Sequence, residues 1–250
     1  MNEQTEAQQL EQFKKLLEAE KQEFLAVMSH ELRTPMTGVK GYLSMLLDGD
    51  ACELGPKTKD YVAQAYVANE RLIRLVDQMF KTASLQEGQI KFKIIKVDLV
   101  EQVELLIHDF TFPANDKKIT LSFKKPEHKV WVEADPDRLR EIIAQLLSNA
   151  LKFTPGDQNG QISVRIELNH SVAKIIVKDS GIGIEKRSQN RLFELFTKAN
   201  LTLTGQEKGT GLGLYFAKKL AQAQSGDVWL EESEVNKGST FIASFPLINI

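Results

Sequence analysis

Seven consecutive residues near the N-terminus, Ser29 to Pro35, bring together an imidazole, a carboxylate, a guanidinium and a hydroxyl. On a helix, His30 and Thr34 are four residues apart and therefore share a face. Glu31 follows His30 directly, where its carboxylate can hydrogen-bond the imidazole. When a carboxylate accepts the proton of one ring nitrogen, the other nitrogen keeps its lone pair and can act as a nucleophile. The stretch therefore predicts nucleophilic chemistry at His30, with an electrophile supplied from elsewhere in the chain.

A second group of polar side chains follows one face of a helix predicted from Pro136 to Lys152. Gln145, Asn149 and Lys152 are separated by steps of four and three, which aligns them. An amide oxygen is a hard ligand that suits Mg²⁺, and an ammonium is a point charge that suits a phosphate. The pattern is compatible with a magnesium phosphate site and also with an ordinary solvated helix face.

Two glycine-rich segments follow. In Asp179 to Ile184 an apolar strand ends in a carboxylate, with Gly181 and Gly183 after it. Gly209 to Leu214 precedes a predicted helix, so its bare backbone amides and the helix N-terminus can cradle phosphate oxygens. The second segment does not follow a Rossmann strand, and the chain has no Walker-type motif. The predicted phosphate cradle therefore belongs to another nucleotide fold.

Composition excludes several classes of protein. The chain has 250 residues, of which 42% are hydrophobic, and a net charge of −2, which predicts a globular protein without the basic footprint of a nucleic-acid or membrane-surface binder. The single cysteine, Cys52, excludes an intrachain disulfide. No apolar run approaches the roughly 18 residues of a membrane span. We expect a soluble fragment that has no contact with nucleic acid or membrane.

The apolar pattern divides the chain into three parts. Residues 1–24 have apolar residues spaced three and four apart, which predicts a short coiled coil. We interpret this part as a signalling helix. Residues 25–86 show two long amphipathic helices around a loop at Asp48 to Pro56. One hairpin cannot enclose a core, so we expect two hairpins to form a four-helix bundle in a homodimer. With Met28 and Leu32 turned inward, we expect Val39, Leu43, Leu46 and Leu47 to be buried on the side away from His30.

Residues 90–250 alternate short β-rich runs with helices, after a boundary at Gln86 to Gln89. The predicted fold of this part is an α/β sandwich of the α+β class, with helices on one face of a mixed sheet. Seven strands are expected at Ile90–Val97, Ile119–Phe123, Lys129–Glu133, Gln161–Leu168, Ala173–Lys178, Asp227–Glu231 and Ser239–Phe245. Four helices are expected at Leu99–Phe110, Pro136–Lys152, Glu185–Phe196 and Leu212–Gln224.

Taken together, the motifs resemble the cytoplasmic catalytic core of a sensor histidine kinase from a bacterial two-component system. The segment SHELRTP resembles the phosphoacceptor box of that family, QLLSNALKFTP its asparagine box, DSGIGI and GTGLGL its glycine boxes, and LFELF its phenylalanine box. The five motifs occur in the family's order and cover nearly the whole chain. The resemblance implies that residues 25–86 are the dimerisation and histidine phosphotransfer hairpin and that residues 90–250 are a Bergerat-type ATP-binding domain.

The resemblance also implies roles for individual residues. His30 would be the phosphoacceptor and Glu31 its base. Mg²⁺ would be bound by Asn149 and Gln145, and adenine would be read by Asp179. Phe193 and Phe196 would anchor a lid running from about Glu185 to Lys208. Further contacts to ATP would come from Lys152, Phe153, Gly181, Gly183, Lys208, Gly209, Thr210, Gly211, Leu212 and Gly213.

Three residues depart from the family pattern. The family usually has asparagine where this chain has Gln145, glycine where it has Lys208, and often arginine where it has Lys198. Gln145 keeps an amide but adds a methylene, which changes its contact to the metal or phosphates. Lys208 can supply a cation to the phosphates instead.

The implied function is ATP-dependent autophosphorylation of His30, followed by phosphotransfer to an aspartate in the receiver domain of a response regulator. Thr34 implies phosphatase activity toward the same regulator, because its hydroxyl would orient a water molecule. Two alternatives remain: a dimeric scaffold with a decayed nucleotide site, and a gyrase-like ATPase that uses Glu141 as base. We expect the chain to be the cytoplasmic part of a longer membrane receptor.

Overall fold

The computed structural model of the chain describes residues 31–50, 53–86, 90–156, 159–169, 171–195, 197 and 211–248. The chain divides into two compact units, Met1–Ile90 and Lys91–Ile250. The predicted coiled coil over residues 1–24 and the predicted nucleophile His30 lie outside the described residues. The three-part division of the chain therefore stays a prediction.

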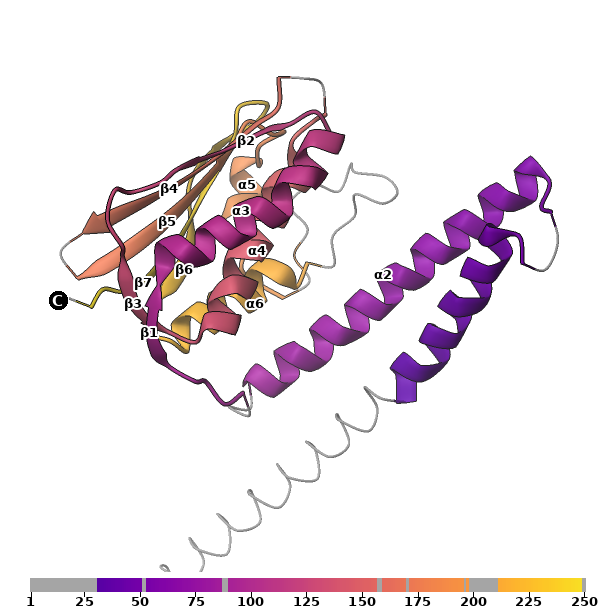
Figure 1. The fold of residues 1–250 in the computed structure, drawn as a ribbon, viewed down its shortest axis with the longest axis horizontal. Helices are drawn as coiled ribbons and strands as arrows, with labels where there is room; N and C mark the ends of the chain where they lie inside the picture. The colour runs from indigo at the N-terminus through magenta and orange to yellow at the C-terminus, as the bar shows by residue number, and fades with distance from the viewer. Residues whose placement is uncertain are drawn as a thin grey trace, which may run out of the picture. The chain divides into compact units, whose positions relative to one another are not determined.

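The first unit is an antiparallel helical hairpin, as predicted. It consists of a helix over residues 31–48 and of α2, Pro56–Gln86 (Figure 1). Later residues of the first helix contact earlier residues of α2, which is the register of antiparallel neighbours. Polar contacts between described residues join the two helices, among them Arg33 Nη2 to Asp77 Oδ1 (2.6 Å), Asn69 Nδ2 to the Met36 carbonyl oxygen (2.8 Å) and Lys40 Nζ to Glu70 Oε1 (2.7 Å).

The hairpin buries little of its apolar surface. Met36 and Phe80 are buried at 8% exposure each, whereas Val39, expected inside, is 48% exposed. The expectation for Val39 is wrong for a single chain because two helices cover only a narrow strip of each other. Large apolar side chains are exposed along both helices: Leu32, Val39, Tyr42, Met45, Tyr61, Leu72 and Met79.

The second unit contains two sheets. The smaller one pairs β1, Ile95–Asp98, with β3, Trp131–Ala134, in antiparallel fashion. The larger one has five strands in the order β2-β4-β5-β7-β6, in which β2 and β4 are parallel and all other neighbours are antiparallel. Its strands are β2 Thr120–Lys124, β4 Gln161–Asn169, β5 Val172–Asp179, β6 Asp227–Glu234 and β7 Gly238–Pro246.

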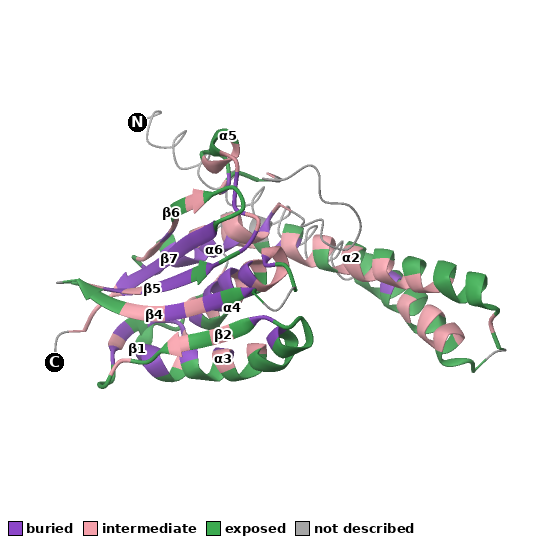
Figure 2. Ribbon diagram, turned by 90° about the horizontal axis from the view of Figure 1, so that it is seen from above, coloured by how far each residue is buried: buried purple, intermediate pink, exposed green. Residues whose placement is uncertain are grey.

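Three helices lie along one face of the five-stranded sheet, as Figure 2 shows: α3 Leu99–Asp116, α4 Pro136–Phe153 and α6 Gly213–Gln222. The core lies between these helices and the sheet, where burial of apolar side chains is the main favourable term in folding. Its fully buried side chains include Leu99, Leu139, Ile142, Ile143, Leu146, Leu147, Ile162, Ile175 and Phe245. The predicted fold class, a helical hairpin followed by an α/β sandwich, is confirmed.

The start of α4 is fixed by a buried carboxylate. Asp135 is the N-cap residue, and its Oδ1 accepts the amide hydrogens of Asp137 and Arg138. Its Oδ2 accepts the amide hydrogen of Lys93, 2.8 Å away, and its own amide donates to Gln224 Oε1 at 2.7 Å. Burial opposes ionisation of Asp135, but the three amide donors outweigh it and hold the pKa of the carboxyl below its usual value.

Two predicted elements have half of their expected length or less. The strand predicted from Ile90 begins at Ile95, because the amide of Lys93 bonds the Asp135 carboxylate instead of a neighbouring strand. The helix predicted from Glu185 to Phe196 is α5, Lys186–Gln189, followed by turns. After α5 the amides bond carbonyls three residues back, and the Gln189 side chain is occupied by the Ile184 and Ser233 carbonyls. Among the described helices, none is long and apolar enough to cross a bilayer.

Candidate functional site

Asp179, the predicted reader of adenine, is a buried carboxylate at the end of β5. Its side chain is 5% exposed, and its Oδ1 accepts the amide hydrogens of Gly181 at 2.8 Å and Ser239 at 3.2 Å. Desolvation by burial raises the pKa of this carboxyl to about 6, although the two amide donors oppose the shift. Among the described residues both bonds end on Oδ1, so the second oxygen is available to a donor group of a ligand.

The two glycines after Asp179 are required by close backbone contacts. A Cβ at Gly181 would lie 2.5 Å from the carbonyl oxygen of Phe153, the last residue of α4, and 2.7 Å from Asp179 Oδ1. Gly183 has φ +64, and a Cβ there would lie 1.9 Å from the carbonyl oxygen of Glu234. The segment is therefore pressed between α4 and the end of β6, and this packing alone accounts for both glycines.

The polar face of α4 has the predicted order. Gln145 Nε2 donates to Asn149 Oδ1 at 3.1 Å, and both side chains are half-buried. Lys152 Nζ lies 4.8 Å from the centre of the Phe153 ring. Amide oxygens suit Mg²⁺, and the ammonium group of a lysine about one helical turn later suits a phosphate. This face can therefore hold a metal nucleotide.

The helix α6 begins beside this face. Gly211 has φ +76, and Leu212 is 1% exposed. Gly213, the first residue of α6, lies against Gln145: a Cβ at Gly213 would be 2.5 Å from the Gln145 Cδ and Oε1 atoms. The structure thus brings the described end of the second glycine segment, Gly211 to Leu214, to the amide face of α4, although Gln145 and Gly213 are 68 positions apart in the sequence.

Phe193, a predicted lid anchor, lies under a lysine of α6. Lys218 Nζ is 5.0 Å from the centre of the Phe193 ring, and it also donates to the Val228 carbonyl oxygen at 2.8 Å. The half-buried aromatic ring is held by a cation that is itself fixed to β6. The other residues predicted for the lid and cradle, Phe196, Lys208, Gly209 and Thr210, lie outside the described residues.

The part of the phosphoacceptor stretch that the structure describes is on the helix over residues 31–48. Glu31 and Thr34 are both exposed there, in the first unit. Arg33, between them, donates from Nε and Nη2 to Asp77 Oδ1 of α2 at 3.0 and 2.6 Å. Glu31 and Thr34 are thus accessible on a helix whose start is tied to its neighbour by an ion pair.

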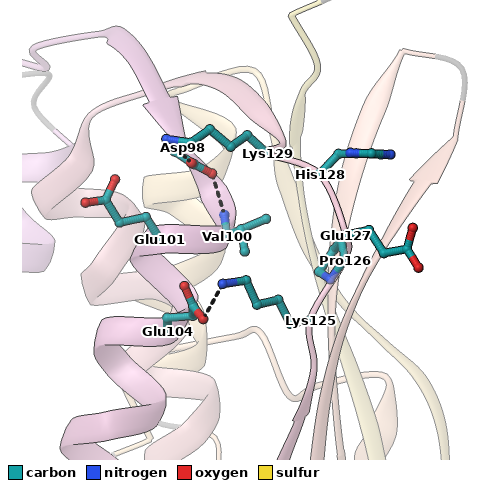
Figure 3. Close-up of a pocket in the computed structure, with 9 residues that line it drawn as sticks. All are labelled: Asp98, Val100, Glu101, Glu104, Lys125, Pro126, Glu127, His128 and Lys129. Carbon is teal, nitrogen blue, oxygen red and sulfur yellow. Dashed lines mark hydrogen bonds and ion pairs between the residues drawn. The ribbon is translucent and has the colours of Figure 1, made fainter.

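Two cavities of the second unit have no lining residue from α4 or α6. The larger, about 310 Å³, lies between the start of α3 and the connection from β2 to β3 (Figure 3), and no predicted site residue lines it. Its lining residues are Asp98, Val100, Glu101, Glu104, Lys125, Pro126, Glu127, His128 and Lys129. The smaller, about 160 Å³, includes Asp179, but its other residues belong to strands and turns and none to α4 or α6.

Sequence reasoning missed some residues that build the site. Ser239 donates its amide to Asp179 because residues 179 and 239 are paired across β5 and β7. Gln189 and Lys218 hold the segment after Asp179 to β6. No local motif marks these residues, since their roles depend on the order of strands in the sheet. Only the polar positions within otherwise apolar segments could have drawn attention to them.

Two family models match successive parts of the chain. Residues 20–88 match the His Kinase A (phospho-acceptor) domain, and residues 134–249 match the family of histidine kinase-, DNA gyrase B-, and HSP90-like ATPases. The sensor histidine kinase WalK of Bacillus subtilis is 31% identical over 234 residues, which are 92% of this chain and 37% of WalK. The histidine-protein kinase BarA of Escherichia coli is 34% identical over 230 residues, 88% of this chain and 24% of BarA.

Among solved structures, the crystal structure of full-length ShkA in complex with AMPPNP has a TM-score of 0.72 and 26% identity, covering 91% of this chain and 46% of that chain. The chain therefore spans less than half the length of these relatives. A phosphoacceptor domain followed by an ATPase domain of the histidine kinase type is the arrangement of a two-component kinase core. This chain belongs to the family of sensor histidine kinases.

Proposed function

We propose that the chain transfers the γ-phosphoryl group of magnesium ATP to a nitrogen of His30. The bond from phosphorus to the bridging oxygen of ADP breaks as the bond to the imidazole nitrogen forms, and Glu31 accepts the proton of the other ring nitrogen. Such a transfer depends mainly on positioning and on neutralisation of charge. The observation that carries the proposal is that a phosphoacceptor domain and an ATPase domain of the histidine kinase type follow each other in one chain.

The described site residues support this use of ATP. Asp179 presents a buried oxygen to a donor such as the adenine amino group, and an unpaired buried carboxylate would penalise other bases. Asn149 offers an amide oxygen to Mg²⁺, and Lys152 offers a cation to a phosphate one turn later. Mg²⁺ would neutralise phosphate charge. Gly211 and Gly213 would approach the phosphates with Gly209 and Thr210, while Lys208 would add a cation.

The test is incubation with ATP labelled at the γ position. We expect a protein label that is labile in acid and stable in base, that is lost in His30→Gln and that is retained in His108→Gln. His108 is a suitable control because its side chain is 92% exposed on α3 of the second unit. Release of free phosphate without protein label would instead indicate the ATPase, and neither product would indicate the scaffold.

We propose that the phosphoryl group then passes to an aspartate of a response regulator, and that Thr34 assists the reverse, hydrolytic reaction. Thr34 is exposed on the first helix of the hairpin, where a hydroxyl can orient a water molecule. Thr34→Ala is expected to leave autophosphorylation within about twofold while it lowers the rate of regulator dephosphorylation by about tenfold or more. The measurement is loss of label from a phosphorylated receiver domain. Thr37→Ala, three residues on and also exposed, is the control; an equal loss of both activities would contradict the role.

The hairpin supports a homodimer. Its exposed apolar residues, Tyr42 at 72% and Tyr61 at 60% among them, belong to both helices, and the described part of the chain does not cover them. A second hairpin would complete a four-helix bundle. We also propose a cytoplasmic location as part of a membrane receptor, because the motifs resemble the cytoplasmic core of a sensor histidine kinase; the chain covers 37% of WalK and 24% of BarA.

A further inference from the structure

The side-chain amide of Gln145 contacts two separate parts of the candidate nucleotide site. Its Nε2 donates to Asn149 Oδ1 at 3.1 Å, within α4. The same amide faces Gly213, where a Cβ would lie 2.5 Å from Cδ and Oε1 and 2.6 Å from Nε2. One side chain therefore contacts both the predicted metal ligand Asn149 and the first residue of α6.

Gly213 is matched in size to this amide. Its φ is not in the left-handed region, unlike that of Gly211 at +76, so the backbone conformation at Gly213 does not require glycine. Alanine would even favour the helix by about 1 kcal/mol where nothing opposed it. The requirement comes from the neighbour, because three atoms of the Gln145 amide lie 2.5–2.6 Å from the place where a Cβ would stand. A larger residue at 213 must displace either the amide or the start of α6.

The hydrogen bond to Asn149 fixes the direction of an oxygen ligand. A carbonyl oxygen has two lone pairs, so Asn149 Oδ1 can accept from Gln145 and still offer a lone pair to a cation. Partners behind a metal ligand commonly fix its orientation in this way, and their loss weakens metal binding by about 10- to 100-fold. An asparagine at 145 would be shorter by one methylene and would withdraw the amide from Gly213.

We infer that Gln145 is a positioning residue. It holds the Asn149 oxygen in the direction of Mg²⁺ and sets the spacing between α4 and the start of α6, and it does not bind the cation itself. This inference rests on the proposed function, because it assigns magnesium ATP to the same site. It differs from the prediction that Gln145 is a metal ligand beside Asn149, and the two roles respond differently to substitution.

The size match is tested on the ligand-free chain by thermal unfolding of Gly213→Ala, Gln145→Ala and the double variant. With Gln145 present, Gly213→Ala is expected to displace the end of the Gln145 side chain and to lower Tm by about 2–4 °C, a modest loss because this end can shift. In the Gln145→Ala background the same substitution is expected to be neutral or to raise Tm. Ser148→Ala, exposed on α4, is the control for loss of a side chain from this helix. An equal effect of Gly213→Ala in both backgrounds would overturn the match.

The positioning role is tested by the gain in AMPPNP affinity on adding Mg²⁺, measured by calorimetry. Gln145→Glu keeps the length of the side chain and supplies a better cation ligand, but it has no hydrogen to donate to Asn149. Positioning predicts that Gln145→Glu loses about tenfold of the Mg²⁺-dependent gain, as Gln145→Ala does. A retained or larger gain in Gln145→Glu would overturn the inference. Failure of the wild-type chain to bind AMPPNP would contradict the proposed function, and the ligand-free cycle would then decide the size match by itself.

Discussion

Replacing Asp179 by asparagine is expected to lower the affinity for adenine nucleotides by about 100-fold or more at pH 7.5. Asparagine can still accept the amides of Gly181 and Ser239 with its oxygen, but its NH₂ group then stands where the second carboxylate oxygen was. A donor would face the donating amino group of adenine. Calorimetry with AMPPNP measures the loss, and Asp109→Asn, with a 71% exposed side chain, is the control. An affinity within threefold of wild type would contradict adenine recognition by Asp179.

If Asp179 binds adenine as proposed, the affinity for adenine nucleotides is expected to depend on pH. Because burial raises the pKa of Asp179 to about 6, its carboxyl is largely protonated at pH 5 and ionised at pH 7.5. The ionised form is the stronger acceptor, so AMPPNP affinity is expected to rise with pH through about 6 and to level off above pH 7. The Asp179→Asn variant should lack this rise.

The stability of the ligand-free domain should change in the opposite direction. The folded pKa of Asp179, about 6, lies above the ordinary value of 3.8, so the folded state binds more protons between these two pH values. The stabilising contribution of protonated Asp179 to the free energy of unfolding is therefore fully present below about pH 4. It is lost as the pH rises to about 6. Removal of this charge in Asp179→Asn is expected to stabilise the ligand-free domain at pH 7.5 by up to about 3 kcal/mol. If Asp179→Asn has a higher Tm than the wild type and yet does not bind AMPPNP, the loss of binding is not caused by misfolding.

Replacing Gly183 by alanine is expected to destabilise the second unit by about 3–5 kcal/mol. The backbone there has φ +64, and the added Cβ would lie 1.9 Å from the Glu234 carbonyl oxygen and 2.6 Å from its carbon. Backbone atoms cannot yield as the end of a side chain can, so the segment after Asp179 must move away from β6. Thermal unfolding measures the loss.

Two further variants separate the causes of this effect. Asparagine tolerates positive φ, so Gly183→Asn keeps the overlap and reduces the conformational penalty. We expect Gly183→Asn to be nearly as unstable as Gly183→Ala. Lys237→Ala removes only an exposed ion pair to Glu234 in the neighbouring turn and should change stability by less than about 0.5 kcal/mol. If Gly183→Ala is as stable as Lys237→Ala, the backbone around Gly183 can move without cost and the prediction is wrong.

Several helices and strands of the second unit could be predicted from the sequence, because the spacing of apolar residues along the chain reports local secondary structure. The side of α4 away from Gln145, Asn149 and Lys152 is apolar and buried, and the N-cap Asp135 and Pro136 begin the helix at the predicted residue. The strand that ends in Asp179 was also predicted, since its apolar run is bounded by a carboxylate and glycines. These features depend on neighbours within about one turn of helix or one strand.

The remaining features depend on partners distant in sequence. The strand order β2-β4-β5-β7-β6 places Ser239 beside Asp179, and no alternation within β7 encodes that pairing. Gly183 was expected to admit the nucleotide, yet its closest neighbour is the backbone of Glu234. Val39 was expected inside and is exposed, because the surface that would cover it belongs to no described part of this chain. In each case the sequence identifies the residue type and leaves its contact undefined.

The bond from the Lys93 amide to Asp135 has a mechanical consequence. Lys93 is among the first residues of the second unit, whereas Asp135 begins α4 and is bonded through its amide to Gln224, just beyond the end of α6. Lys93 is therefore connected through Asp135 to the start of α4, and through Asp135 and Gln224 to the end of α6. Asn149 and Gly213 are carried by the far parts of these two helices. We therefore expect a displacement of Lys93 to reach both of the helices that carry the candidate nucleotide site.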